Sequence, residues 1–404
     1  MSKESVPIGR PSVLRHTNAL SILRLLREAG SCSRADLVRA SGLSAPTVTN
    51  VVKDLLDSGL IEPLGEGKSS GGRPPDMIRF KAERGCVLGV EISATAISFL
   101  LADLNGVELD TYKVSLLKQK TTPEAVCGYI GEALRALLRK HKMKRDQLLV
   151  MVVGVPAITN VRDGLVLSIS TLDQWRSVPL RAMLNEIVDC LVIIENDMNL
   201  AAQGERYRGA AQYEQDFVFI SIGTNVGAGI VLNGKTHYGS QWSAGEIGYL
   251  HLPNISRKNP RIHEFGELES VLTSGGILAS WHEANAKPGK NKQAGSDGVD
   301  AVEILNLAEA GDAQAEKIIQ HRAGLVSDIV VNLSLILNPG LVLLGGEVGG
   351  HLAILRSVQK QLEGSEFAVT KVAAGALGST AVVWGGIAIA LQEIPAVLVP
   401  QPEI

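Results

Sequence analysis

Apolar residues recur at helical spacing in three short segments near the start of the chain. The first segment predicts a helix over residues 18–29, and the second predicts a helix that begins at Ser33, with Asp36 completing an acidic form of the capping box. A third helix is predicted from Ser44, after a short turn that contains Gly42. This order of helix, glycine turn and helix is typical of the helix-turn-helix motif. The apolar stripe of the third helix consists of Val48, Val51, Val52, Leu55 and Leu56.

The polar face of the third helix is the candidate DNA-recognition surface. Such a helix enters the major groove, where small polar side chains reach base edges and phosphates. A plain three-helix bundle with a solvated polar face is the alternative that the pattern leaves open. On the DNA-binding interpretation, the contacts come from Ser44, Ala45, Thr47, Thr49, Asn50 and Lys53.

Two predicted strands, at 59–64 and 77–80, follow the third helix. The segment 65–75 between them is rich in Gly and Ser, contains Lys68 and ends in Gly-Gly-Arg-Pro. It is typical of the wing of a winged helix, from which Arg73 can enter a narrow, electronegative minor groove. The alternative is an interdomain linker, and one segment can serve as both. We therefore predict a winged helix-turn-helix domain over residues 1–82.

The distribution of charge and cysteine supports a cytoplasmic DNA-binding protein. Residues 1–82 contain 12 Lys and Arg against 8 Asp and Glu, a formal charge of +4, whereas the whole chain is at -3 and the remainder therefore at -7. A basic N-terminal segment followed by an acidic remainder indicates that the N-terminal segment binds a partner that the remainder does not bind. The four cysteines are far apart and no signal peptide is visible, which favours a reduced compartment. No apolar run approaches the ~20 residues of a membrane helix, so we expect no membrane contact.

The rest of the chain alternates strands and helices. Three strands predicted at 85–92, 96–104 and 107–114 pair as an antiparallel set, and later strands are separated by helices. This pattern predicts an α/β layer built on a mixed sheet. The apolar run 191–194 leads directly into Glu195-Asn196-Asp197-Met198-Asn199. Because ligands bind at the carboxyl ends of strands in such sheets, Asp197 is a candidate ligand-binding carboxylate; a helix cap is the alternative.

Two glycine-rich segments and an acidic helix start follow. Gly223-Thr224-Asn225-Val226-Gly227 lies between two strands, where backbone N–H groups can approach an anion, or where the chain merely bends. Glu246 lies between glycines in 244–248, which is an unusual place for a charge. Glu269 lies near the start of a predicted helix, where stabilisation of the helix dipole is the alternative to a binding role.

These motifs together resemble the ROK family of repressors, open reading frames and sugar kinases, which has the actin-like ATPase fold. The motifs are 195–202, 223–231 and 244–248, in this order and at these spacings. The preceding winged helix is similar to that of the xylose and N-acetylglucosamine repressor branch. The resemblance implies a first actin-like lobe at 83–195 plus 380–404. It implies a second lobe at 196–379, which carries the sugar cleft and the dimerisation surface.

The resemblance also implies roles for individual residues. Asn196 and Asp197 would bind sugar hydroxyls, with Asp197 at the position of the general base of the kinases. Glu246 and Glu269 match further sugar-binding carboxylates, whose oxygens accept from hydroxyl donors. Remnants of phosphate-binding loops fall at Thr95, Gly223, Thr224, Gly227, Gly345 and Gly346.

Two departures from the family pattern concern activity and metal binding. The kinases have an Asp-x-Gly-Gly-Thr loop where this chain has Glu91-Ile92-Ser93-Ala94-Thr95, and side chains would occupy the space that phosphates need. We therefore expect no kinase activity, with Asp197 a vestigial general base. The family's zinc-binding His is Tyr249 here, and no cysteine lies between residues 191 and 404. His251 and His263 are poor zinc ligands without cysteines, so we expect no metal or other cofactor, and Tyr249 offers a hydroxyl to the effector.

The sequence thus predicts a cytoplasmic, sugar-responsive regulator, most simply a repressor of genes for carbohydrate uptake or catabolism. Its partners would be operator double-stranded DNA, a sugar or sugar derivative between the lobes, and further copies of itself in a dimer or tetramer. Lobe closure would change the spacing of the DNA-binding domains. Two alternatives stay open: a bifunctional ATP-dependent sugar kinase with a DNA-binding domain, and a DNA-binding dimer that responds to no ligand.

Overall fold

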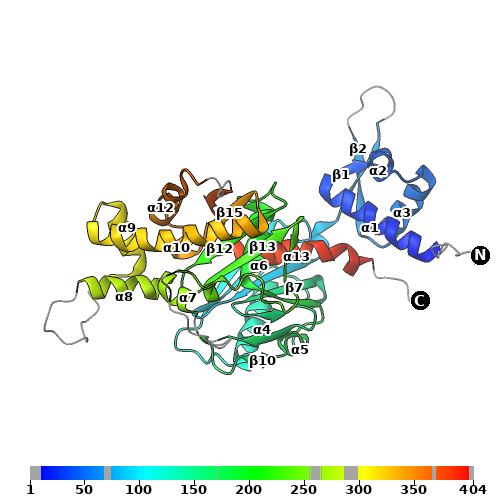
Figure 1. Ribbon diagram of the computed structural model, residues 1–404. Helices are drawn as coiled ribbons and strands as arrows, with labels where there is room; N and C mark the ends of the chain where they lie inside the picture. The colour runs from blue at the N-terminus through cyan, green and yellow to red at the C-terminus, as the bar shows by residue number, and fades with distance from the viewer. Residues whose placement is uncertain are drawn as a thin grey trace, which may run out of the picture.

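The N-terminal part of the chain folds into a small domain at one end of the molecule (Figure 1). The computed structural model describes residues 11–67, 74–169, 171–253, 255, 264, 266–285, 299–365 and 370–399. Three helices and an antiparallel sheet in the order β1-β3-β2 form this domain. The elements are α1 (Pro11–Ala29), β1 (Ser31–Ser33), α2 (Arg34–Ser41), α3 (Ala45–Asp57), β2 (Ile61–Glu66) and β3 (Asp76–Phe80).

The predicted helix-turn-helix is confirmed, including its caps. Ser33 and Asp36 form a reciprocal capping box at the start of α2, and the Ser44 side chain accepts from the N–H of Thr47 at the start of α3. Helix α1 begins at Pro11, earlier than the predicted residue 18. The reason is visible at Leu14, which is 55% exposed, so the first turns of α1 bury no apolar stripe that a sequence pattern could reveal.

The segment 65–75 connects two paired antiparallel strands, as the wing interpretation expects, and its residues 68–73 lie outside the described part of the chain. Strands β2 and β3 pair from Ile61 opposite Phe80 to Glu66 opposite Asp76, so the segment closes a hairpin. The N–H of Gly67 donates to the carbonyl of Pro75 at 2.8 Å and ties the two ends together. The connection to the rest of the chain runs instead through the short 3-10 turn that follows Phe80.

The first lobe is built on a five-stranded mixed sheet, as predicted. Its order is β11-β7-β4-β5-β6, in which β4, β5 and β6 are antiparallel and β7 and β11 run parallel to β4. A small sheet, β10-β9-β8, lies at its side. The elements are η1 (Ala82–Arg84), β4 (Cys86–Ile92), β5 (Ala96–Asp103), β6 (Glu108–Ser115), α4 (Pro123–Lys140), η2 (Arg145–Gln147), β7 (Leu148–Val155), β8 (Thr159–Asn160), β9 (Leu165–Ser168), β10 (Arg176–Val178), α5 (Leu180–Asn185) and β11 (Leu191–Asn196).

The second lobe is built on a second five-stranded sheet, in the order β14-β13-β12-β15-β16. Strands β12 and β13 form the predicted hairpin, and β15 and β16 run parallel to β12. The remaining elements are α6 (Asp197–Arg208), β12 (Phe217–Ile222), β13 (Val226–Leu232), β14 (Lys235–Thr236), η3 (Ile247–Tyr249), α7 (Glu267–Leu272), α8 (Ser274–Ala284), α9 (Ala301–Glu309), α10 (Ala313–Leu337), β15 (Leu341–Gly345), α11 (Gly346–Gly349), α12 (Leu352–Leu362), β16 (Lys371–Ala374), η4 (Gly378–Thr380) and α13 (Ala381–Leu398).

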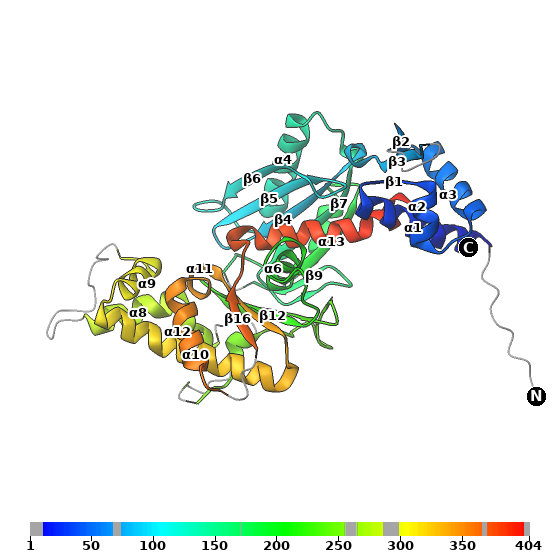
Figure 2. The ribbon, with the colours of Figure 1, turned by 90° about the horizontal axis from the view of Figure 1, so that it is seen from above.

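Helices α6 and α13 cross in the centre of the molecule with their backbones in close approach. A Cβ at Gly385 would overlap the carbonyl oxygen of Leu200, and a Cβ at Gly204 would overlap the carbonyl of Ala381. On its other side α13 lies on β4, where a Cβ at Gly89 would overlap the carbonyl of Val383. Figure 2 shows α13 running from this crossing, along the first sheet, to the winged helix. Glycine is required at these positions because any side chain would push the backbones apart.

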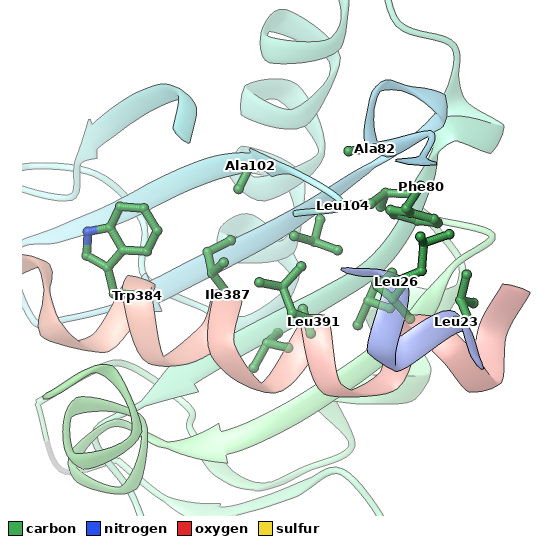
Figure 3. Close-up of a cluster of buried hydrophobic side chains, with 14 of the residues drawn as sticks. Leu23, Leu26, Phe80, Ala82, Ala102, Leu104, Trp384, Ile387 and Leu391 are labelled. Carbon is green, nitrogen blue, oxygen red and sulfur yellow. The ribbon is translucent and has the colours of Figure 1, made fainter. Parts of the chain in front are cut away.

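The winged helix shares its hydrophobic core with the first lobe and α13. Figure 3 shows Leu23 and Leu26 of α1 and Phe80 of the wing sheet next to Leu104 and Leu391. The contact is also polar, because the guanidinium of Arg27 donates to the carbonyls of Leu391 and Leu104, at 2.8 Å each. The winged helix is therefore packed against α13 and the first lobe.

Helix α13 is apolar enough to need a comment on membranes. Gly378–Leu398 is, in the described part of the chain, the single helix that could cross a membrane by length and composition, which corrects the expectation that no segment approaches that length. However, 67% of that window is buried inside the protein, against α6 and the first sheet. Burial to this extent is typical of a helix in the core of a protein.

The α6–α13 crossing predicts that Gly385→Ala destabilises the fold strongly, by about 3 kcal/mol, because the new Cβ overlaps the Leu200 carbonyl. Gly128→Ala is the matched control. Gly128 is exposed in the middle of α4, and a Cβ there meets nothing within 4 Å. This control should gain about 0.5–1 kcal/mol from helix propensity. Urea unfolding measures both variants, and equal effects of the two would contradict the packing described.

Candidate effector cleft and DNA-recognition surface

Asn196 and Asp197 lie where β11 ends and α6 begins. The Oδ1 of Asn196 accepts from the N–H groups of Met198 and Asn199 at 2.9 and 3.1 Å, and its Nδ2 donates to the carbonyl of Ala157 at 3.1 Å. The helix-cap alternative is thus confirmed for Asn196, which keeps one amide hydrogen for a ligand. Asp197 is the first residue of α6, and its carboxylate lines a cleft between the lobes.

Glycines bring the backbone of the second lobe close to α6 at this point. A Cβ at Gly229 would overlap the carbonyl of Met198, so β13 can touch the first turn of α6 only because residue 229 has no side chain. Gly245 has φ +95° and accepts from the N–H of Ala228 at 2.8 Å. This contact holds the following residue, Glu246, beside β13. The charge between two glycines is therefore placed in the cleft by backbone packing.

Glu269 forms the wall of the cleft next to Glu246. Its carboxylate accepts from the N–H of Val226 at 3.1 Å and from the N–H of Gly266 at 3.3 Å, so it caps α7 and also fixes the start of β13. Burial raises the pKa of Glu269, and these two N–H donors lower it in part. Burial and then the charge of Glu269 raise the pKa of Glu246 to about 7. Two neighbouring carboxyls thus share a poorly solvated wall.

The cleft has a volume of about 510 Å³, and the residues that line it include four carboxyl side chains that are largely removed from water. These are Glu91 from β4, Asp197, Glu246 and Glu269. Burial raises the pKa of Asp197 well above its usual range, and the charges of Glu91 and Glu246 raise it further. Buried acceptors of this kind are stabilised by a ligand that brings hydroxyl or ammonium donors. The arrangement fits a polyhydroxylated ligand between the lobes.

Tyr249 also lines the cleft, but its hydroxyl is engaged within the protein. It donates to the carbonyl of Glu264 at 2.8 Å. Burial and the nearby charges of Glu269 and Glu246 raise its pKa to about 12, so it stays protonated. Of the groups weighed as zinc ligands, the four cysteines all precede residue 191, His251 is outside the lining of the cleft, and His263 lies outside the described residues.

The predicted remnants of phosphate-binding loops are only partly brought together. Thr95 and Gly345 do not line the cleft; Thr95 is exposed in the β4–β5 turn, and Gly345 packs on the ring of Phe219. That turn is closed internally, since the N–H of Ser93 donates to the carbonyl of Ala96 at 2.9 Å and the Ser93 hydroxyl accepts from the N–H of Ala96 at 3.1 Å. The positions that do line the cleft are Gly223, Thr224, Gly227 and Gly346.

The cleft is lined by further residues that were not among the predicted site residues, and two of them are Glu91 and Asn199. Glu91 was noted only as a departure from the kinase loop, although a charge in the otherwise apolar strand 86–92 is itself a signal. Asn199 lines the cleft, is 6% exposed and donates through Nδ2 to Glu195 at 3.0 Å, while its Oδ1 is buried without a partner. Asn199 belongs to the motif 195–202 that carries the family resemblance, which was the signal that could have found it.

Six of the eight predicted DNA-recognition residues lie on α3 or at its N-cap. Thr47 is half-buried and forms a hydrogen bond with the Ser44 hydroxyl at 2.8 Å. The face opposite Val48 and Val51 is free to meet a groove, since those residues are buried. Lys68 and Arg73 lie outside the described residues. The exposed members of this face are Ser44, Ala45, Thr49, Asn50 and Lys53.

Comparisons with known proteins agree with this architecture. A family model described as ROK family matches residues 87–393, and one described as winged helix-turn-helix DNA-binding matches residues 15–62. The chain is 25% identical to a xylose repressor of Caldicellulosiruptor bescii over 96% of this chain and 98% of that protein. It is 29% identical to a glucokinase of Halalkalibacterium halodurans over 76% of this chain and 95% of that protein.

The fold is also found in a solved structure. A ROK family transcriptional regulator, described as a homologue of the E. coli MLC protein, superposes with a TM-score of 0.77 at 22% identity, over 96% of this chain and 98% of that chain. The ROK family model spans more than half of the sequence, and the winged helix precedes it. The chain therefore belongs to the ROK family and carries an N-terminal winged helix-turn-helix domain.

Proposed function

We propose that this protein is a sugar-responsive, DNA-binding transcriptional repressor of genes for carbohydrate uptake or catabolism. The winged helix contains a candidate recognition helix, α3. The cleft is lined by hydrogen-bond acceptors and is large enough for a sugar. The relatives that match nearly the whole chain include proteins named xylose repressor. On this proposal a sugar or sugar derivative binds between the lobes and alters operator affinity.

The observation that carries the proposal is the continuous packing between the cleft and the recognition helix. Asp197 begins α6, and α6 crosses α13 at Gly385. Helix α13 in turn accepts a hydrogen bond from Arg27 of α1 and shares a core with the winged helix. A ligand that binds one arrangement of the lobes more tightly shifts the population of that arrangement, and the winged helix moves with α13.

Three finer points belong to the same proposal. The protein acts as a homo-oligomer, a dimer or tetramer, because one short recognition helix gives too little affinity and specificity alone. It works in the cytoplasm, where its thiols stay reduced. It functions without a bound metal, since the groups around Tyr249 lack cysteine ligands.

A bifunctional sugar kinase is the second candidate, favoured by the carboxyl of Asp197 in the cleft and by the glucokinase relative. The β4–β5 turn opposes it, because Ser93 and Ala94 line the cleft where the kinases have glycines and the turn closes on itself. We propose that the protein does not phosphorylate sugars. Sugar-dependent consumption of ATP by the purified protein would favour the kinase.

The exposed face of α3 predicts that Asn50→Ala weakens DNA binding without affecting the fold. A DNA site selected from random duplexes, followed by fluorescence anisotropy, measures the affinity. Loss of one base contact costs about 1–3 kcal/mol, so we expect at least about a fivefold loss of affinity. Asn105→Ala, an exposed asparagine in the first lobe, is the control and should bind as the wild type does. An unchanged affinity for Asn50→Ala would move the recognition surface away from this face.

The position of Asp197 predicts that Asp197→Asn abolishes the response to sugar and leaves DNA binding intact. A ligand at about 100 times its dissociation constant stabilises the wild type by about 2.7 kcal/mol, and the variant should show no such gain. The free variant should be more stable than the wild type, because a poorly solvated carboxyl is removed. Asp189→Asn, at an exposed carboxylate, is the control. A full sugar response in Asp197→Asn would place the ligand elsewhere.

The raised pKa of Glu246 predicts a pH-dependent stability of the free protein. The folded protein holds this proton up to about pH 7, whereas the unfolded chain releases it near pH 4.5. The folded state therefore binds more protons in this window, and stability falls as the pH rises from about 4.5 to 7, by up to about 3 kcal/mol. Glu246→Gln should reduce this fall, and Glu269 and Asp197 sustain the remainder.

Urea unfolding across that pH window measures the effect. The Glu246→Gln variant should match the wild type at about pH 4.5 and exceed it at about pH 8. Glu132→Gln, on the exposed side of α4, serves as the control and should leave the curve unchanged. Parallel curves for the wild type and Glu246→Gln would contradict the assignment.

A further inference from the structure

The titratable groups that line the effector cleft are acidic, with no basic residue among those described. Among the described residues that line it, six are acidic, and none is Lys, Arg or His. Lys113, the cation that acts on Glu91, is exposed on β6, across β5 from Glu91, and is not part of the lining. The six acidic residues are Glu91, Asp197, Glu246, Glu264, Glu269 and Glu347.

Glu91 and Asp197 both line the cleft, and the charge of Glu91 acts on Asp197. Glu91 comes from β4 of the first sheet, and Asp197 comes from the start of α6. Burial raises the pKa of both groups, and the charge of Glu91 raises that of Asp197 further. Ser98 donates to Glu91, and the Asp197 carboxyl accepts from the backbone N–H groups of Met198 and of Asp197 itself. Such a pair is stabilised most by a cation between its members.

The lining of the cleft also contains a buried acceptor that has no partner among the described residues. The Oδ1 of Asn199 is buried without a partner in the lining, while its Nδ2 is used by Glu195. A buried acceptor that stays unsatisfied costs free energy, which a ligand with several N–H or O–H donors can recover. A phosphate ester brings acceptors and negative charge, and would be repelled by this lining. A protonated amine brings three donors and a positive charge.

We propose that the effector is an amino sugar, whose protonated amine is held between the carboxylates of Glu91 and Asp197 while its hydroxyls meet Glu246 and Glu269. This inference rests on the proposed function and specifies its ligand class. The amine would lie next to the β4–β5 turn. Phosphate is disfavoured there because the turn is closed by its own hydrogen bonds and carboxylates lie nearby. Neutral sugars bind the same cleft more weakly, because they leave the like-charge pair uncompensated.

The test measures ligand affinity of the full-length protein at about pH 7 by thermal unfolding and calorimetry. The probes are matched pairs: glucosamine with glucose, galactosamine with galactose, and mannosamine with mannose, together with N-acetylglucosamine and glucose 6-phosphate. We expect at least one amine to bind about tenfold or more tightly than its neutral parent, which corresponds to about 1.4 kcal/mol. N-acetylation, which removes the charge, should cancel this preference.

Variants locate the preference. Glu91→Gln should reduce the ratio between the affinities for amine and parent to about threefold or less. Glu347→Gln is the matched control, because Glu347 also lines the cleft but accepts from Ser274, and it should keep the ratio. Equal losses in the two variants would overturn the Glu91–Asp197 clamp in favour of a diffuse acidic field.

The remaining outcomes separate the two levels of the argument. A neutral or phosphorylated sugar that binds as tightly as its amine, or more tightly, would overturn the amino-sugar inference and leave the sugar-responsive repressor intact. An absence of binding by every probe, with normal DNA binding, would overturn the amino-sugar inference and count against the sugar response itself.

Discussion

The arrangement of this protein depends on one backbone contact, the crossing of α6 and α13. Gly204 and Gly385 let the two helices approach until carbonyl groups face Cα atoms, with no side chain between them. Because no side chains interlock there, the contact supports small sliding movements better than a surface of interdigitated side chains. The cleft lies at the start of α6, and the winged helix lies against the far part of α13. Any change in the angle between these helices therefore changes the relation between the ligand site and the DNA-binding surface.

The two helices are held by different parts of the protein. Gly229 lets β13 touch the first turn of α6, so α6 follows the second lobe, whereas Gly89 lets β4 touch α13, so α13 follows the first lobe. Arg27 and the shared core then fix the winged helix to α13. Lobe closure on a ligand is thus expected to carry the winged helix as part of the first lobe. This gives the ligand an effect on DNA geometry without any unfolding or long linker.

Local features were well predicted from the sequence because each depends on a few adjacent residues. The caps at Ser33 and Ser44, the mixed sheet and the placement of Glu246 between glycines all follow from short motifs. The sequence was less informative where packing between distant segments decides. The connection of two paired strands by 65–75 depends on the pairing of β2 with β3.

The site itself was only partly accessible from sequence. The resemblance indicated Asp197, Glu246 and Glu269, which the structure gathers in one cleft. The resemblance gave no reason to expect Glu91 in the same cleft as Asp197. The position of Glu91 corresponds to the start of a phosphate-binding loop in the kinases. The internal partner of Tyr249 comes from a segment 15 residues away, and no local pattern could show it.

The most direct test of this account is a distance measurement between the lobes and the winged helix, by pulsed electron paramagnetic resonance with spin labels on introduced cysteines. Asp57 of α3, Glu132 of α4 and Lys317 of α10 are exposed label positions, in a background where the half-buried Cys190 is replaced by serine. On addition of the ligand, the account predicts that the distance from 57 to 317 changes while the distance from 57 to 132 stays constant. A change in the distance from 57 to 132, or no change in either distance with ligand bound, would contradict it.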